Sequence, residues 1–250
     1  MLAGFPRAVW LIQRRRGPAC YHPRPMTPTP RFEAVLFDCD GVLVDSEAIT
    51  NGVLRDMLQE AGWNLTLAEC MRLFLGKAVK DERTLIEART GKPFTEAWLA
   101  SFRERRNARL QQEVGAIAGA PAAVERIHAA FDGRIACASG ADRIKVELQL
   151  ARCGLARFFA GRVFSGHETP RSKPAPDVYL AAAAALDADP RRCAVIEDTV
   201  PGTTAGVAAG ATVFGYSPPE AGHAGPAALR AAGAVLVFTD MRELPALLAG

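Results

Sequence analysis

The chain has 250 residues, of which 49% are hydrophobic and 23% are charged, a composition typical of a folded globular protein and not of a disordered or fibrous one. No apolar run approaches the roughly 18 residues of a membrane-spanning helix, so we expect no membrane partner. The formal charge of +3 conceals an asymmetry, because residues 1–31 carry six arginines and no acid whereas the rest carries 24 basic and 27 acidic residues. The body is therefore mildly acidic and lacks the basic surface that a nucleic-acid partner requires.

Residues 1–30 are rich in arginine and proline and show no sustained apolar period. This composition predicts a disordered extension, or a start codon assigned too early with Met26 as the true start. The alternative is a targeting segment, because arginine-rich N-termini without acids are typical of transit peptides. We expect no catalytic residue in this segment.

From Glu33 onward, short apolar runs alternate with helical patterns. The runs have the continuous apolar character of strands buried on both faces of a parallel sheet, and they cover 34–37, 134–138, 161–164, 193–196, 211–214 and 234–237. Helical segments are predicted at 121–130, 144–153, 176–186, 202–209 and 241–248. The alternation predicts an α/β fold with a doubly wound, mostly parallel sheet, formed by residues 31–45 and 115–250.

One long segment interrupts this alternation. About 95 residues separate the first two predicted strands, and helical spacing covers 47–61, 67–75, 79–89 and 95–113 without a convincing strand. A crossover between parallel strands needs only a dozen or so residues, so we predict an inserted helical domain over 46–114. Its hinges are expected near Asp45–Ser46 and 113–119. An insertion directly after the first strand is typical of a lid over whatever that strand presents.

The cysteine pattern indicates a reducing compartment. The closest two of the six cysteines, Cys137 and Cys153, are sixteen positions apart, so no C-x-x-C metal or redox motif is present. Several cysteines lie in apolar stretches, where a thiol behaves as a small buried hydrophobic group. We therefore predict free thiols and a cytoplasmic protein.

Chemically active side chains follow four successive predicted strands. In strand order they are Asp38 with Asp40, Ser139 with Gly140, Lys173, and Glu197 with Asp198. Because open parallel sheets bind ligands outside the carboxyl ends of their strands, we expect these groups at one edge. Carboxylates suit a divalent cation, while hydroxyl, ammonium and backbone N–H groups suit phosphate oxygens. The set predicts a site for a metal ion and a phosphoryl group.

Each of these residues alone also has a purely structural interpretation. Asp-x-Asp-Gly is typical of a turn, Ser139 of a helix N-cap, and Lys173 of a solvated loop. Glu197 and Asp198 would equally suit the start of the helix that follows them. Their convergence at consecutive strand ends favours the functional interpretation.

Four segments resemble the motifs of the haloacid dehalogenase (HAD) superfamily, in that family's order. They are FDCDGVLVDS at 37–46, ASG at 138–140, SKPAPD at 172–177 and IEDTVPG at 196–202. The resemblance extends over residues 33 to about 215 and includes the helical insertion, which is similar to a C1-type cap. The branch it resembles contains phosphoglycolate phosphatases and β-phosphoglucomutases, and it is also similar to 6-phosphogluconate phosphatase.

The resemblance implies a Mg²⁺-dependent phosphatase with a Rossmann-like core. Asp38 would attack phosphorus and form an aspartyl-phosphate, and Asp40 would protonate the leaving alcohol and then deprotonate a water. The remaining roles are implied as follows: Asp38, the main-chain carbonyl of Asp40, and Asp198 hold Mg²⁺; Glu197 is a further ligand or lies beside the metal; Ser139, Gly140 and Lys173 bind phosphate.

Three other activities are weighed against hydrolysis. Dehalogenation needs neither Mg²⁺ nor a second acid, so Asp40 and Asp198 argue against it. Mutases of the β-phosphoglucomutase type carry a histidine on the first cap helix, where this sequence has Thr50, so the mutase is the alternative and hydrolysis is preferred. A non-catalytic binding module would have lost Asp38, Asp40 or Lys173, and all three are present.

Substrate selection is expected to lie in the helical insertion. The segment 74–77 joins two predicted helices, and Lys77 would meet a second anionic group of the substrate. Glu47, near the first hinge, would meet a sugar hydroxyl; the structural alternatives are a solvated lysine and support of the first helical turn. The expected partner is a small phosphorylated metabolite, a sugar phosphate or a phosphogluconate-like compound, bound by a monomer or small homo-oligomer.

Overall fold

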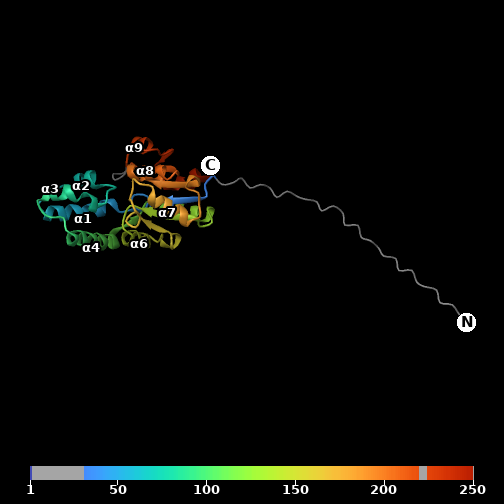
Figure 1. Ribbon diagram of the computed structural model, residues 1–250, viewed down its shortest axis with the longest axis horizontal. Helices are drawn as coiled ribbons and strands as arrows, with labels where there is room; N and C mark the ends of the chain where they lie inside the picture. Colours follow the sequence, from blue (N-terminus) through green and yellow to red (C-terminus); the bar gives the residue numbers. More distant parts are fainter. Residues whose placement is uncertain (2–30, 220–223, 250) are drawn as a thin grey trace.

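The computed structural model describes residue 1, residues 31–219 and residues 224–249, and Figure 1 shows their arrangement. The predictions for the N-terminal segment therefore lie outside the described residues. None of the helices in the described part of the chain combines the length and the hydropathy that a bilayer crossing needs.

A sheet of six parallel strands forms the centre of the α/β part. Its order is β5 (Val163–Ser165), β4 (Ile135–Ser139), β1 (Ala34–Phe37), β6 (Cys193–Glu197), β7 (Thr212–Tyr216) and β8 (Leu236–Phe238). Each neighbouring pair is parallel. The predicted doubly wound α/β fold is confirmed, with strand positions that differ by one or two residues from the apolar runs.

Helices cover both faces of this sheet. One face packs against α5 (Ala120–Ala130), α6 (Arg143–Arg152) and α10 (Leu244–Ala249), and the other against α7 (Asp177–Ala185), α8 (Val200–Ala208) and α9 (Pro226–Ala231). The side chains of β1 alternate between the two cores, with Val35 and Phe37 in one and Ala34 and Leu36 in the other. Because both faces are buried, the strands read as continuous apolar runs.

The helical insertion lies at one end of the molecule, beyond the carboxyl ends of the strands (Figure 1). It consists of α1 (Glu47–Glu60), α2 (Leu67–Phe74), the 3-10 turn η1 (Val79–Glu82), α3 (Arg83–Thr90) and α4 (Glu96–Glu113). These helices pack around their own apolar cluster, which includes Leu54, Leu58 and Phe102. A capping box between Thr66 and Glu69 begins α2.

Four features differ from the sequence prediction. A two-stranded antiparallel ribbon, β2 (Val44–Asp45) with β3 (Gly115–Ala116), connects the insertion to the α/β part, where no strand was predicted. Two residues are too few to show a period, which explains the error. The helix α9 was also not predicted, and the helices expected at 79–89 and 241–248 each begin with a 3-10 turn, η1 and η4 (Met241–Glu243). Two further 3-10 turns, η2 (Ala156–Phe158) and η3 (Pro190–Arg192), lie in connections.

Candidate active site

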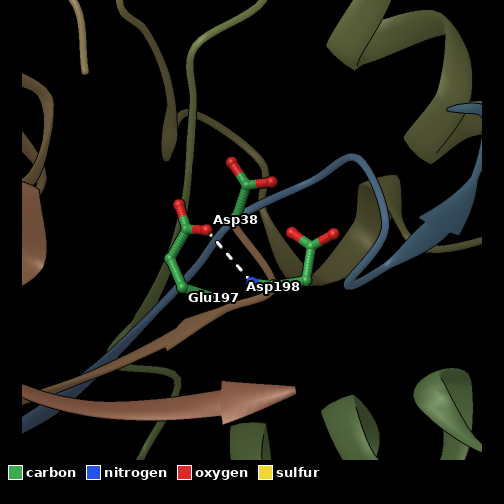
Figure 2. A group of neighbouring side chains, drawn as sticks. All are labelled: Asp38, Glu197 and Asp198. Atoms are coloured by element: carbon green, nitrogen blue, oxygen red, sulfur yellow. Dashed lines mark hydrogen bonds between the residues drawn. The ribbon is translucent and has the colours of Figure 1, made fainter. Parts of the chain in front are cut away.

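Three carboxylates meet at the carboxyl edge of the sheet. Asp38 follows β1, and Glu197 and Asp198 lie at the end of the adjacent β6, so the pairing of these strands brings the groups together. One oxygen from each lies within 4.8 Å of the others, and all three residues are buried (Figure 2). Buried carboxylates this close repel one another unless cations balance them.

Two glycines make room for this cluster. A Cβ on Gly41 would lie 2.2 Å from Oδ2 of Asp198, and a Cβ on Gly202 would lie 1.7 Å from Oε1 of Glu197. Gly41 also has a φ of +77°, a conformation that other residues rarely adopt. The glycine of the D-x-D-G motif is therefore needed both for the turn and for the position of Asp198.

Lys173 supplies one positive charge to the cluster. Its Nζ donates to Oδ1 of Asp38 at 2.5 Å and to Oε1 of Glu197 at 2.7 Å. It also lies 4.8 Å from the centre of the Tyr179 ring, and the Tyr179 hydroxyl donates to the same oxygen of Glu197 at 2.7 Å. The structure thus places the lysine of the predicted third motif directly beside the predicted nucleophile.

Glu197 uses both of its oxygens within the protein. Oε1 accepts from Lys173 and Tyr179, while Oε2 accepts from the Thr199 N–H at 3.1 Å and the Thr199 hydroxyl at 3.0 Å. Oε2 also accepts from the Asp198 N–H at 3.1 Å, the bond marked in Figure 2. These bonds hold Lys173 and the start of α8 in place. Of the two interpretations left open for Glu197, they favour a position beside the metal over direct coordination.

The donor set fits a hard divalent cation. Asp38 and Asp198 offer buried carboxylate oxygens, the ligand type that Mg²⁺ prefers. Burial raises the pKa of Asp38 well above its ordinary value, opposed by the charge of Lys173, and burial and the charge of Glu197 raise the pKa of Asp198 in the same way. A second positive charge at this position would stabilise the ionised form of both groups.

The side chain of Asp40 points to a different set of partners. Its Oδ1 accepts from Nζ of Lys145 at 2.7 Å, from the amide of Gln149 at 2.9 Å, and from the Ser46 hydroxyl. Burial raises the pKa of Asp40, but the charge of Lys145 and these hydrogen bonds outweigh that effect and lower it to about 2. Asp40 is therefore a carboxylate in this state, and its side chain lies outside the group of three carboxylates near one another.

Ser139 and Gly140 lie at the end of β4, on the other side of β1 from β6. The Ser139 hydroxyl accepts from the Ala141 N–H at 3.0 Å, and a hydroxyl that accepts can still donate its own hydrogen. The N-cap of α6 is Asp142, whose carboxylate accepts from the Lys145 N–H at 3.0 Å. The capping alternative for Ser139 is therefore wrong.

Some of these groups line a cavity of about 350 Å³ between the sheet edge and the helical insertion. The α/β part contributes Asp38, Asp40, Ser139, Gly140, Lys145 and Lys173, and the insertion contributes Glu47, Thr50, Lys77, Lys80, Arg103 and Arg106. The size suits a small metabolite. The segment that joins α2 to η1 reaches the α/β part, because a Cβ on Gly76 would lie 3.3 Å from the Thr199 side chain.

The two residues predicted to contact substrate both line this cavity, and both already have partners. Nζ of Lys77 lies 3.3 Å from Oε1 of Glu82, in a pair whose lysine is half-exposed. Glu47 accepts from the side-chain amide of Asn51 at 3.0 Å. The structure therefore places Glu47 and Lys77 where they were expected and does not separate the functional from the structural interpretation.

Several cavity residues were missed by sequence reasoning. Arg106 on α4 is buried and pairs with Asp142 at 2.8 Å, which joins the insertion to α6. Lys80 and Arg103 line the cavity together with His167, whose pKa is lowered first by burial and then by the charge of Lys80, with a smaller contribution from Arg103. A sequence signal existed only for Lys145 and Gln149, which are four residues apart and so share a face of α6.

Comparison with known proteins gives consistent relatives. The family model described as "haloacid dehalogenase-like hydrolase" matches residues 32–210. The chain is 31% identical to the 6-phosphogluconate phosphatase of Escherichia coli over 185 residues, which cover 74% of this chain and 82% of that protein. A HAD family hydrolase from Deinococcus radiodurans, solved with bound phosphate and sodium, is 37% identical with a TM-score of 0.71 and covers 88% of this chain and 96% of its own. A haloacid dehalogenase-like protein from Agrobacterium tumefaciens is 31% identical, with a TM-score of 0.74 over 87% of this chain and 98% of its own.

Proposed function

The chain belongs to the haloacid dehalogenase-like hydrolase family, and on that basis we propose that it is a Mg²⁺-dependent phosphatase of a small phosphorylated metabolite. The observation that carries the proposal is the contact between Asp38 and Lys173, which both line a cavity of about 350 Å³ and lie beside two further buried carboxylates. One site would then combine a nucleophile, a cation that neutralises phosphate charge, and a set of hard oxygen ligands.

In the first step, the carboxylate of Asp38 attacks phosphorus and the bond to the leaving oxygen breaks, which leaves an aspartyl-phosphate. Asp40 gives the departing alkoxide a proton. Asp40 takes up this proton from solvent when the substrate binds, because the dianion of the phosphate monoester adds negative charge nearby and raises the pKa of Asp40 from its low value. Lys173, the Ser139 hydroxyl and backbone N–H groups near Gly140 bind the non-bridging oxygens.

In the second step, a water attacks the aspartyl-phosphate and Asp40 takes its proton, which releases phosphate and restores Asp38. The ionised state of Asp40 suits it to this role. Mg²⁺, held by Asp38, Asp198 and the main-chain carbonyl of Asp40, would neutralise phosphoryl charge when bound. Glu197 would hold Lys173 and the Asp198 loop in position.

The insertion supports a substrate with a second polar or anionic region. Lys80 and Arg103 line the cavity from the side of the insertion and offer positive charge to a carboxylate or a second phosphate. Thr50 also lines this cavity, and its buried side-chain oxygen lacks a hydrogen-bond partner among the described residues. We therefore place the substrate among sugar phosphates and phosphogluconate-like compounds. We treat the insertion, residues 46–114, as a cap domain.

A mutase remains the less favoured activity. It requires a group on α1 that shuttles protons while the substrate turns over, and Thr50 on the cavity wall has no imidazole to do this.

The hydrolase also suits a cytoplasmic location, because the five cysteines among the described residues are all free thiols.

The test is phosphate release from p-nitrophenyl phosphate and from a panel of sugar phosphates and phosphorylated sugar acids, with Mg²⁺ or with EDTA. We expect activity only with Mg²⁺, and a loss of at least about a hundredfold in Asp38→Asn, because its amide cannot act as the nucleophile. Equal rates in EDTA, or equal rates for Asp38→Asn, would refute the mechanism. Conversion of a sugar 1-phosphate to its isomer without net phosphate release would favour the mutase.

A further inference from the structure

We propose that Lys145 and Gln149 on α6 are positioning residues that orient the Asp40 carboxylate, so that its second oxygen serves the leaving group of the substrate. This inference rests on the proposed phosphatase and adds to it a pair of residues outside the four motifs. The observation behind it is that the hydrogen bonds to Asp40 all reach Oδ1 in the described part of the chain.

The donors approach Oδ1 from two directions. Ser46, at the start of α1, reaches it from the hinge, and Lys145 and Gln149 reach it from successive turns of α6. With Oδ1 held by three donors, Oδ2 is the oxygen left for a ligand, and Asp40 lies on the cavity wall with only 13% of its side chain exposed. A carboxylate held at one oxygen has little freedom to rotate, which is the property a proton donor needs to meet one leaving atom.

The two residues on α6 are themselves held in place. Asp142 caps the first turn of α6 through the Lys145 N–H, and the carboxylate of Asp142 also pairs with Arg106. Gln149 is fully buried, and the Cys39 thiol lies 3.8 Å from its Oε1, so that its amide nitrogen faces Asp40. Lys145 is 5% exposed, and burying an ammonium group is costly unless a carboxylate compensates it.

On the exposed face of a helix, a lysine keeps its hydration and avoids the free-energy cost of burying its ammonium group. Here a buried lysine and a buried glutamine, four residues apart on one helix face, donate to the same oxygen of Asp40. A purely structural role would need only that the charge of Asp40 be neutralised. If the role is positioning, substitution of Lys145 or Gln149 also slows the reaction more when the leaving group needs the proton that Asp40 delivers.

The leaving group separates these two roles. Nitrophenolate departs without a proton, whereas an alkoxide needs one, and general acids contribute typically 10²–10⁴-fold when they are needed. The quantity to measure is kcat/KM, which reports the steps up to release of the first product, for p-nitrophenyl phosphate and for the best alkyl phosphate of the wild-type panel. The ratio of the alkyl to the aryl value is then compared between variants.

In Lys145→Met we expect this ratio to fall at least about tenfold, and in Gln149→Leu at least about threefold. Lys145→Arg keeps an N–H donor and should restore the ratio to within about threefold of wild type. The matched control is Lys92→Met, which removes an exposed lysine that does not line the cavity and should leave the ratio unchanged. Circular dichroism and melting temperature establish that each variant is folded; if Lys145→Met does not fold, the arginine and leucine variants carry the test.

The outcomes distinguish this inference from the proposed function. A wild-type enzyme that releases phosphate from neither class of substrate refutes both. An active wild type whose Lys145→Met and Gln149→Leu variants keep the wild-type ratio refutes the positioning role alone. A drop in the ratio that Lys145→Arg reverses supports it.

Discussion

Removing the charge of Lys173 tests whether the carboxylate cluster is balanced as described. In Lys173→Met, a side chain of similar length no longer pairs with Asp38 and Glu197, both of which are buried. Removing one partner of a buried ion pair typically costs about 3–5 kcal/mol. Because a protein of this kind has roughly 5–15 kcal/mol of stability, we expect Lys173→Met to lose about a fifth or more of it without Mg²⁺.

The pH dependence of this loss follows from the pKa of Asp38. Burial raises that pKa, and removing the Lys173 charge, which lowers it, raises it further. A group with a raised pKa favours the folded state at low pH, and this contribution is lost as the pH rises through the folded-state pKa. The deficit of Lys173→Met should therefore shrink as the pH falls and Asp38 takes up a proton.

Urea denaturation in EDTA, followed by circular dichroism, measures the effect on the whole fold. The tryptophans among the described residues, Trp63 and Trp98, both lie in the helical insertion, so their fluorescence reports that part separately. Adding Asp38→Asn to Lys173→Met removes the unbalanced charge and should recover at least about 1 kcal/mol. Arg109→Met breaks an exposed pair with Glu113 and should leave the free energy of unfolding nearly unchanged. A Lys173→Met variant as stable as wild type in EDTA at about pH 8 would refute the reasoning.

Two further predictions concern the cavity. Arg106→Met leaves Asp142 without its partner on α4, and we expect the free energy of unfolding to fall by about 1–3 kcal/mol in urea titrations. This loss is smaller than for a fully buried pair because Asp142 retains some exposure. An unchanged free energy of unfolding would contradict the link between the insertion and α6. Mg²⁺ requires ionised carboxylates, while burial raises the pKa of Asp38 and Asp198, so millimolar Mg²⁺ should raise the melting temperature more at about pH 8 than at about pH 5; an equal or larger rise at the lower pH would contradict this assignment.

The strands and the strand-end groups were predictable because each rests on a local signal. The apolar runs located the six strands of the sheet, and the rule that parallel strands bind ligands at their carboxyl ends brought Asp38, Ser139, Lys173 and Glu197 to one edge. The ribbon of β2 and β3 escaped because a two-residue strand has no period.

The partners of Asp40 were not predictable in the same way. Lys145 and Gln149 lie on a helix that reads as amphipathic, where polar residues ordinarily face water. The contacts of α6 with Asp40, in the loop after β1, turn this pair inward. Arg106 was missed for the same reason, since α4 carries many charged residues and sequence alone does not show which of them faces α6.

The short ribbon of β2 and β3 has a consequence for how such a protein changes over time. Val44 pairs with Ala116 and Asp45 with Gly115, so the chain leaves the α/β part and returns to it through the two paired strands of this ribbon. The helices between the two strands form their own apolar cluster. Recombination at these two crossings would therefore exchange the whole helical insertion in one event, while the sheet and the carboxylates at its edge are inherited unchanged.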